Sequence, residues 1–443
     1  MAASSRVLVA LVCVACNADS TPRPTPEEWA LLRTLRYDAA PPPANASNRV
    51  ADDLQARALG QRLFFEPAFS GALVEPDNDG TSATLGVKGQ SGRVSCAGCH
   101  VPTSGFVDTR SPHRQISLAA EWSQRRTPSL LDVSFASLFN WDGRRDSIWG
   151  QAIGVMESPR EFNSSRLYVA EQMFRLYRTD YEALFGAMPP LDDAARFPQL
   201  SGGETGCSAA TPPTCRGMPG DGADFDHLAT ADQQIVTEVV VHTAQTLEAY
   251  VRQLRCGEAR FDRWLDGDMA ALSSAEQRGA ALFVGRADCV RCHAGPRFSD
   301  EKFYNVGLAP HTVATAFVDT DDHGAFAGIT ALLADPLNTK GSFSDGDPQH
   351  LPAAADPSLE GAFRTPSLRC LSAHPSFMHT AQHATLDEVV AFFDRGGDPV
   401  GYPGTSQIHR LGLSPSERAD LVAFLGTLQG PGPSTDLLAP FTR

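Results

Sequence analysis

Two short segments of the 443-residue chain carry the same pattern, Cys-X-X-Cys-His. The members of the two copies are Cys96, Cys99 and His100, and Cys289, Cys292 and His293. Two thiols at this spacing can add to the vinyl groups of a haem, and the following histidine can bind its iron. A zinc site is the alternative, but the two cysteine pairs lie farther apart along the chain than zinc-binding pairs usually do. The pattern therefore predicts two covalently bound c-type haems, with His100 and His293 as proximal iron ligands.

Each copy of the pattern follows a segment in which apolar residues recur at helical spacing. Residues 51–65 precede the first copy and residues 274–283 precede the second. The second segment has an acidic residue, Glu276, near its start, as suits a helix N-terminus. Further helical patterns cover residues 164–185, 233–255, 386–393 and 415–428, whereas strand signals are few. We therefore expect a mainly α protein in which each half is a helix followed by a haem-binding loop.

The domain boundaries follow from this repeat. We expect an N-terminal haem domain over residues 49–235 and a C-terminal haem domain over residues 236–443. Gly-rich and polar stretches predict an inserted loop at 199–230 and a second long loop at 309–360.

The first residues of the chain predict export. Residues 1–16 combine a basic start, a short apolar stretch and small residues, which is typical of a secretory signal. Cys16 follows Val14-Ala15, so it could also be the lipidated residue of a bacterial lipoprotein; an ordinary signal cut nearby is the alternative. Residues 17–48 are rich in proline and predict a semi-rigid tether. We expect a periplasmic protein, with a tether to the outer membrane through Cys16 left open.

Four further cysteines have no place in the haem motifs or the signal. They are Cys207, Cys215, Cys256 and Cys370. An oxidising compartment permits two disulfides among them, and the sequence alone allows three pairings. We favour Cys207–Cys215, across a Pro/Gly loop, together with Cys256–Cys370.

The charge of the chain restricts its partners. The formal net charge is −15, from 37 Lys and Arg against 52 Asp and Glu. This balance argues against nucleic acid and anionic membrane surfaces and is compatible with a cationic protein partner. No apolar run approaches the roughly 18–20 residues of a spanning helix.

An ordered series of short motifs between about Leu59 and Leu428 resembles the bacterial di-haem cytochrome c peroxidase family, including its MauG-type members. Besides the two haem motifs, the series includes Arg-Thr-Pro-Ser-Leu-Leu (126–131), Trp-Asp-Gly-Arg (141–144), Phe-Arg-Thr-Pro-Ser-Leu-Arg (363–369), Phe-Met-His (377–379) and Asp-Arg-Gly-Gly (394–397). The resemblance implies two cytochrome-c-like helical domains whose haems face their interface.

The resemblance also implies roles for two residues. At the family's spacing after Trp141, Glu161 takes the place of the acid that helps to break the O–O bond of peroxide at the N-terminal haem. Trp141 takes the place of the indole that relays electrons between the haems. Without the family, Glu161 reads as a solvated acid and Trp141 as a core residue.

Two arginines are candidates for pairing with haem propionates. They are Arg125 and Arg144, because a guanidinium matches carboxylate geometry. Surface ion pairs are the alternative for both.

Three positions depart from the family. Phe393 stands where the C-terminal haem normally takes a Met or Tyr ligand, so this haem is five-coordinate or uses Met378, His374 or His383.

His113, the nearest candidate for a histidine that caps the resting N-terminal haem, lies off register. Arg126 replaces the Asn that helps to bind calcium, and a guanidinium repels a cation, so we doubt the calcium and expect the Arg126 charge to replace it.

Three functions compete. The leading one is an exported haem peroxidase that reduces hydrogen peroxide with electrons from a periplasmic carrier such as cytochrome c, a partner that suits the acidic charge. The second is a MauG-like enzyme that spends stored oxidising equivalents on side chains of a partner protein. The third is a non-enzymatic electron-transfer or haem-sensor protein, and the presence of Glu161 speaks against it. A homodimer is left open.

Overall fold

The computed structural model describes residues 24–110, 116–311, 318–348 and 350–442. The expected signal segment, Cys16 and His113 lie outside these residues. In the described part of the chain, no helix combines the length and the apolar character needed to cross a membrane.

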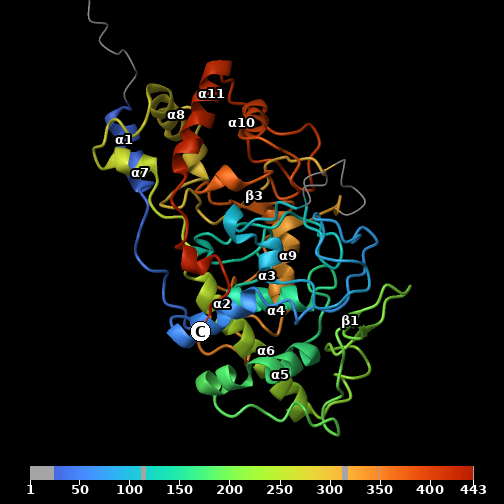
Figure 1. Cartoon of the computed structure of the whole chain (residues 1–443). Coiled ribbons are helices and arrows are strands. Elements are labelled where there is room, and N and C mark those ends of the chain that lie inside the picture. Colours follow the sequence, from blue (N-terminus) through green and yellow to red (C-terminus); the bar gives the residue numbers. More distant parts are fainter. Residues whose placement is uncertain (1–23, 111–115, 312–317, 349, 443) are drawn as a thin grey trace, which may run out of the picture.

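The described part of the chain is mainly helical, as predicted (Figure 1). Its α-helices are α1 Pro26–Thr34, α2 Leu54–Phe64, α3 Cys96–Cys99, α4 Ile148–Glu157, α5 Arg166–Phe185, α6 Thr230–Val251, α7 Arg260–Leu265, α8 Ser274–Val284, α9 Gly324–Ala334, α10 Leu386–Arg395 and α11 Pro415–Leu425. Short 3-10 segments are η1 Pro102–Ser104, η2 Val133–Phe135, η3 Cys289–Arg291, η4 Pro357–Leu359, η5 Leu371–Ala373, η6 Gly426–Leu428 and η7 Thr435–Leu437. Two antiparallel strand pairs join β1 Gly206–Cys207 to β2 Cys215–Arg216, and β3 Phe303–Tyr304 to β4 Phe363–Arg364.

The two helices that precede the Cys-X-X-Cys-His segments are confirmed, and local residues explain where they begin. Asp53 caps α2, because its carboxylate accepts hydrogen bonds from the backbone N–H groups of Gln55 and Ala56. Ser273 and Glu276 form a capping box at the start of α8.

The helices build two separate hydrophobic cores. The first core contains residues of α2, α4, α5 and α6, and the second contains residues of α1, α7, α8, α10 and α11. Figure 1 shows these groups at opposite ends of the molecule, with α3, α9 and β3 between them. In each core, a glycine allows one helix to pack closely against another. A Cβ at Gly60 of α2 would lie 1.8 Å from the Thr246 carbonyl oxygen of α6, and one at Gly279 of α8 would lie 2.0 Å from the Asp420 carbonyl oxygen of α11.

The expected tether over residues 17–48 is wrong from Pro26 onward. Thr25 and Glu28 form a capping box that starts α1. Leu32 and Leu35 are fully buried in the second core, and the ring of Trp29 lies 4.5 Å from that of Trp264. The prolines that flank this segment suggested an extended chain, but the residues between them form a short helix with an apolar face.

The expected long loop over residues 309–360 is also interrupted by a helix. Helix α9 buries Ala325, Ile329 and Leu332 in a small cluster with Leu138. The inserted loop at 199–230 instead keeps its irregular character, with the short β1–β2 pair inside it.

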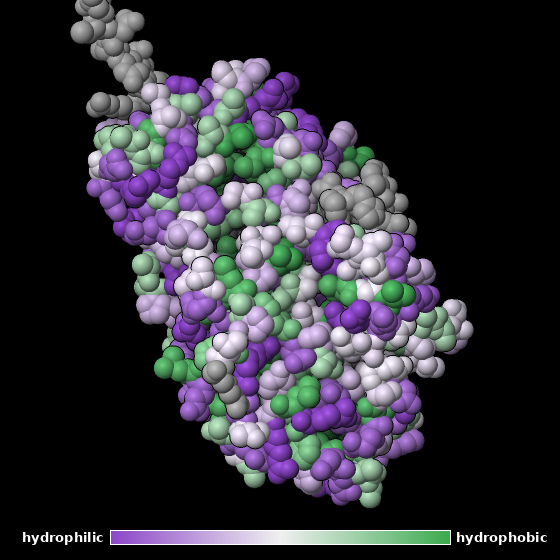
Figure 2. Space-filling model, in the orientation of Figure 1, coloured by the Kyte–Doolittle hydropathy of each residue, from purple (hydrophilic) through white to green (hydrophobic). Residues whose placement is uncertain are grey.

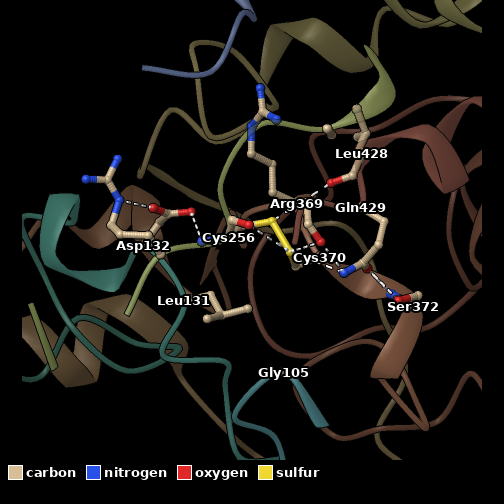
Figure 3. Close-up of a disulfide and its surroundings, with 12 residues drawn as sticks. Gly105, Leu131, Asp132, Cys256, Arg369, Cys370, Ser372, Leu428 and Gln429 are labelled. Atoms are coloured by element: carbon tan, nitrogen blue, oxygen red, sulfur yellow. Dashed lines mark hydrogen bonds and ion pairs between the residues drawn. A yellow bond between two sulfur atoms is a disulfide. The ribbon is translucent and has the colours of Figure 1, made fainter. Parts of the chain in front are cut away.

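Both disulfide pairings that the sequence favoured are confirmed, Cys207–Cys215 and Cys256–Cys370. The first closes the β1–β2 pair. The second joins the segment after α6 to the residue before η5, and Figure 3 shows it beside Asp132, Arg369 and Gln429. This bond therefore links the last helix of the first core to the loop that follows β4.

Candidate functional site

The first Cys-X-X-Cys-His segment presents an intact haem-attachment site. Cys96 and Cys99 belong to α3 and are not part of a disulfide. His100 follows them, and its Nδ1 hydrogen-bonds the carbonyl oxygen of Phe106 at 3.0 Å. Burial lowers the pKa of His100 to about 4, so the ring is neutral. An imidazole held through Nδ1 leaves Nε2 available for iron.

The second segment has the same geometry. His293 follows η3, and its Nδ1 hydrogen-bonds the carbonyl oxygen of Phe298 at 2.8 Å. Burial lowers the pKa of His293. Phe106 and Phe298 both have a positive φ, 58° and 54°, which turns each carbonyl back to its histidine. Cys289 and Cys292 are also free of disulfides.

A Thr-Pro-Ser turn braces each of these loops. The Ser129 hydroxyl donates to the carbonyl oxygen of Gly105 at 2.7 Å. The Ser367 hydroxyl donates to the carbonyl oxygen of Arg297, also at 2.7 Å. Each acceptor precedes the phenylalanine that anchors the histidine, so the two halves repeat one haem-binding module.

A cavity of about 270 Å³ opens at the second segment. Cys289, Cys292 and His293 line it together with apolar residues of α8, α10 and α11. Figure 2 shows hydrophobic residues gathered in a hollow between α10 and α11 on the visible face. Two free thiols, a neutral histidine and apolar walls fit a c-type haem.

Glu161 lies near enough to the first segment to influence its two cysteines electrostatically. Burial raises the pKa of Cys96 and Cys99 to about 12, and the Glu161 carboxylate contributes to the rise in both. Burial also raises the pKa of Glu161 itself, although Arg144, Arg145 and a hydrogen bond from Ser158 act in the opposite direction. The site therefore holds a carboxyl group that retains its proton to higher pH than an exposed one.

Trp141 bridges the two modules. Its side chain is 6% exposed, and its Nε1–H donates to the carbonyl oxygen of Arg126 at 2.8 Å. Its own carbonyl oxygen accepts from the Arg364 N–H at 2.7 Å. Trp141 also lines the cavity of the second segment. The indole is thus fixed between the two Thr-Pro-Ser turns.

The two arginines predicted to pair with propionates differ. Each side-chain nitrogen of Arg125 already donates to a carboxylate, at 2.6 Å to Asp142 and at 2.7 and 2.8 Å to Asp322. Arg144 pairs with Asp142 at 3.1 Å, and its side chain is 42% exposed. The partnership of Arg125 with Asp322 was missed, because nothing in the sequence indicates that residues so far apart meet.

Phe393 lines the cavity from α10, and its hydrocarbon ring cannot bind iron. Met378 and His374 line the same cavity. His383 is not among the lining residues. The first two are therefore the better placed of the alternative ligands that the sequence suggested.

A buried arginine occupies the position at which the family's asparagine helps to bind calcium. The described ranges contain no group of three or more His, Cys, Asp or Glu side chains that could hold a metal. At the position of the family's asparagine, the Arg126 side chain is buried, and its positive charge would repel a divalent cation.

Comparison with known proteins gives a consistent result. A family model described as di-haem cytochrome c peroxidase matches residues 55–201. The methylamine utilization protein MauG of Methylorubrum extorquens is 29% identical over 373 residues, which cover 84% of this chain and 77% of that protein. The cytochrome-c peroxidase IdrP1 of Denitromonas iodatirespirans is 28% identical over 438 residues, covering 95% and 91%.

A solved structure shows the same fold. The diheme peroxidase BthA from Burkholderia thailandensis E264 matches with a TM-score of 0.59 at 21% identity, covering 86% of this chain and 87% of that chain. The repeated haem modules and these relatives lead to one conclusion: this chain is a haem oxidoreductase with two c-type haems, and its sequence is similar to those of di-haem cytochrome c peroxidases and MauG proteins.

Proposed function

We propose that the protein is an exported peroxidase that reduces hydrogen peroxide with electrons from a periplasmic carrier such as cytochrome c. The observation that carries this proposal is the half-buried Glu161 carboxyl, which has a raised pKa and lies near enough to Cys96 and Cys99 to raise the pKa of both thiols. Relatives named cytochrome-c peroxidase support it. The signal pattern of residues 1–16 supports export, and a lipid anchor at Cys16 and a homodimer stay predictions of the sequence.

Cys96, Cys99 and His100 would hold a haem, which would supply iron for peroxide chemistry at this site. Glu161 can take the proton from the incoming peroxide and return it to the oxygen that leaves as water. Its raised pKa suits this exchange, because the carboxyl gives up and regains a proton at a pH closer to neutrality than an exposed one.

Electrons for the reaction would enter through the second module. Trp141 bonds to the residues that precede the two Thr-Pro-Ser turns, Arg126 and Arg364, and lines the second cavity, which supports a relay role for its indole. Its burial and two backbone hydrogen bonds hold it in one position. The net charge of −15 would attract a cationic carrier and accelerate its encounter.

Replacement of Glu161 tests the proposal. Glu161→Gln keeps the size of the side chain and removes its acid, so we expect peroxide turnover with reduced cytochrome c to fall by about 10²–10⁴-fold. The absorption spectra of both haems should stay unchanged. Glu157→Gln is the control, because Glu157 is the last residue of α4, just before the turn that holds Glu161, and it pairs with Arg166; its activity should stay within about twofold of wild type. A Glu161→Gln variant with wild-type turnover would refute the role.

Oxidation of side chains on a partner protein is the second candidate. The absence of the methionine ligand of the peroxidase members favours it, although Phe393 is also not the tyrosine of the MauG-type members. Relatives named MauG agree with this alternative. It predicts that peroxide produces a long-lived oxidised protein that does not oxidise reduced cytochrome c.

A further inference from the structure

Arg126 is a buried cation in the wall of the second cavity. Its residue is 6% exposed. Its backbone is fixed on both sides, because its N–H donates to the His379 carbonyl at 2.7 Å and its carbonyl accepts from Trp141. The guanidinium carbon lies 5.8 Å from the centre of the Trp141 ring. The side chain is therefore held at the junction of the two modules.

Two nitrogens of this buried guanidinium have no hydrogen-bond partner among the described residues. Its Nε and Nη1 are shielded from solvent and have no hydrogen-bond partner among the described residues. Burial lowers the pKa of Arg126 to about 10, which reflects the same unfavourable surroundings. A charge removed from water without an anion costs several kcal/mol in general. A negatively charged group is therefore expected beside it.

The repeat supplies a direct comparison. Arg364 occupies the position of Arg126 in the second Thr-Pro-Ser turn, and it also lines the cavity. Its Nη1 donates to Glu301 at 2.7 Å and its Nε to the Asn140 carbonyl at 3.1 Å. Arg369, another buried arginine of this wall, pairs with Asp262 at 2.8 Å. The chain supplies carboxylates to these two arginines, whereas the described residues supply none to Arg126.

His374 adds a second unpartnered polar group to the same wall. Both of its ring nitrogens are shielded from solvent and make no hydrogen bond to any described residue. It lines the cavity, and the charge of Arg126 is close enough to help burial lower the pKa of His374 to about 3. The ring is neutral and offers one N–H donor. Arg126 and His374 together form a cationic, donor-rich corner of an otherwise apolar cavity.

We propose that Arg126 and His374 bind a propionate carboxylate of the haem attached to Cys289 and Cys292, so that His374 serves the propionate and Met378 stays the candidate iron ligand in this cavity. A propionate supplies the anion and the acceptor oxygens that both side chains lack, and a guanidinium binds a carboxylate well. The inference rests on the presence of the second haem and is independent of which reaction the enzyme catalyses. It gives this haem a cation supplied by the protein.

The reduction potential of the second haem tests the pair in the holoprotein. A fixed positive charge beside a propionate favours the reduced iron, so Arg126→Gln should lower that potential. We expect at least a tenfold change in the reduction equilibrium, which is about 59 mV for a one-electron couple. Arg126→Lys keeps the charge and should restore most of the loss. His374→Gln, which alters one hydrogen bond, should shift the equilibrium by about threefold in the same direction.

Two controls make the result specific. The double variant Glu301→Gln/Arg364→Gln removes an equal number of positive and negative charges from the same cavity and should leave the potential within threefold of wild type. The haem at the second segment can be identified through Cys289→Ala, which leaves it attached by one thioether and moves its reduced absorption band. The proposal is overturned if Arg126→Gln leaves both potentials unchanged, or if the shift occurs in the other haem. A lysine variant as low as the glutamine variant would also overturn it.

Discussion

Burial of the Glu161 carboxyl affects both its pKa and the stability of the folded protein. Its pKa is raised because burial disfavours the carboxylate, with Arg144 and Arg145 compensating only in part. A carboxyl whose folded pKa lies above its unfolded value binds its proton more tightly in the folded state. Stability therefore falls as the pH rises from the unfolded pKa through the folded one. The ionised Glu161 carboxyl therefore lowers the stability of the folded state, and the proposed acid–base role gives a reason for keeping it.

Thermal unfolding of the holoprotein checks this sign. Glu161→Gln has no charge to bury, so its unfolding midpoint should exceed that of wild type at pH 8. The difference should vanish near pH 4, where the carboxyl is protonated in both states. A variant that is less stable than wild type at pH 8 would show that the Glu161 carboxylate is stabilised by its neighbours.

At the residue scale, the attachment site could be read from the sequence because its members are adjacent in the chain. Cys96, Cys99 and His100 need only one turn of helix to meet. The Arg126–His374 corner could not be predicted, because its two members come from different modules. The pairing of Arg125 with Asp322 could not be predicted either, because these two residues are also far apart in the sequence.

Elements with a clear apolar face were predicted, and those without one were not. Helix α8 alternates apolar and polar residues at helical spacing and was expected almost to its observed bounds. Helix α9 has the sequence GAFAGITALLA, which carries no polar face. The polar residues on both sides of it led to the expectation of a loop over residues 309–360. Helix α1 was hidden between prolines, and its burial depends on tertiary contacts such as that of Trp29 with Trp264.

The close packing of α8 on α11 supplies a prediction at the scale of elements. A Cβ at Gly279 would lie 2.0 Å from the Asp420 carbonyl oxygen, so Gly279→Ala must separate the two helices. We expect a loss of about 1–3 kcal/mol, as for other overpacked cores. Gly426→Ala is the control, because a Cβ there meets nothing within 4 Å. Equal unfolding midpoints for the two variants would contradict the packing argument.

At the scale of the whole molecule, covalent and ionic links join the two halves. The Cys256–Cys370 bond connects the segment after α6 to the loop after β4, and Arg125 in the first half pairs with Asp322 in the second. Trp141 lies between the two turns. These links fix the relative position of the two haem modules, on which electron transfer between them depends.

The two disulfides should differ in strength. Cys256–Cys370 closes a separation of 114 residues and Cys207–Cys215 one of 8. If each bond acts by restricting the unfolded chain, removing the first should cost about 5 kcal/mol and removing the second about 2.5 kcal/mol. Paired Cys→Ser variants followed by thermal unfolding measure both. A larger loss for the Cys207–Cys215 pair would show that local structure, not chain entropy, determines the effect.

The central claim is that peroxide is reduced at the first module with electrons that arrive through the second. Its most direct test is to add hydrogen peroxide to the diferric holoprotein in the presence of reduced cytochrome c. We expect fast oxidation of the cytochrome without prior reduction of the enzyme, and loss of this activity in Glu161→Gln. A long-lived oxidised protein that leaves the cytochrome reduced would contradict the account and favour a partner protein as the substrate.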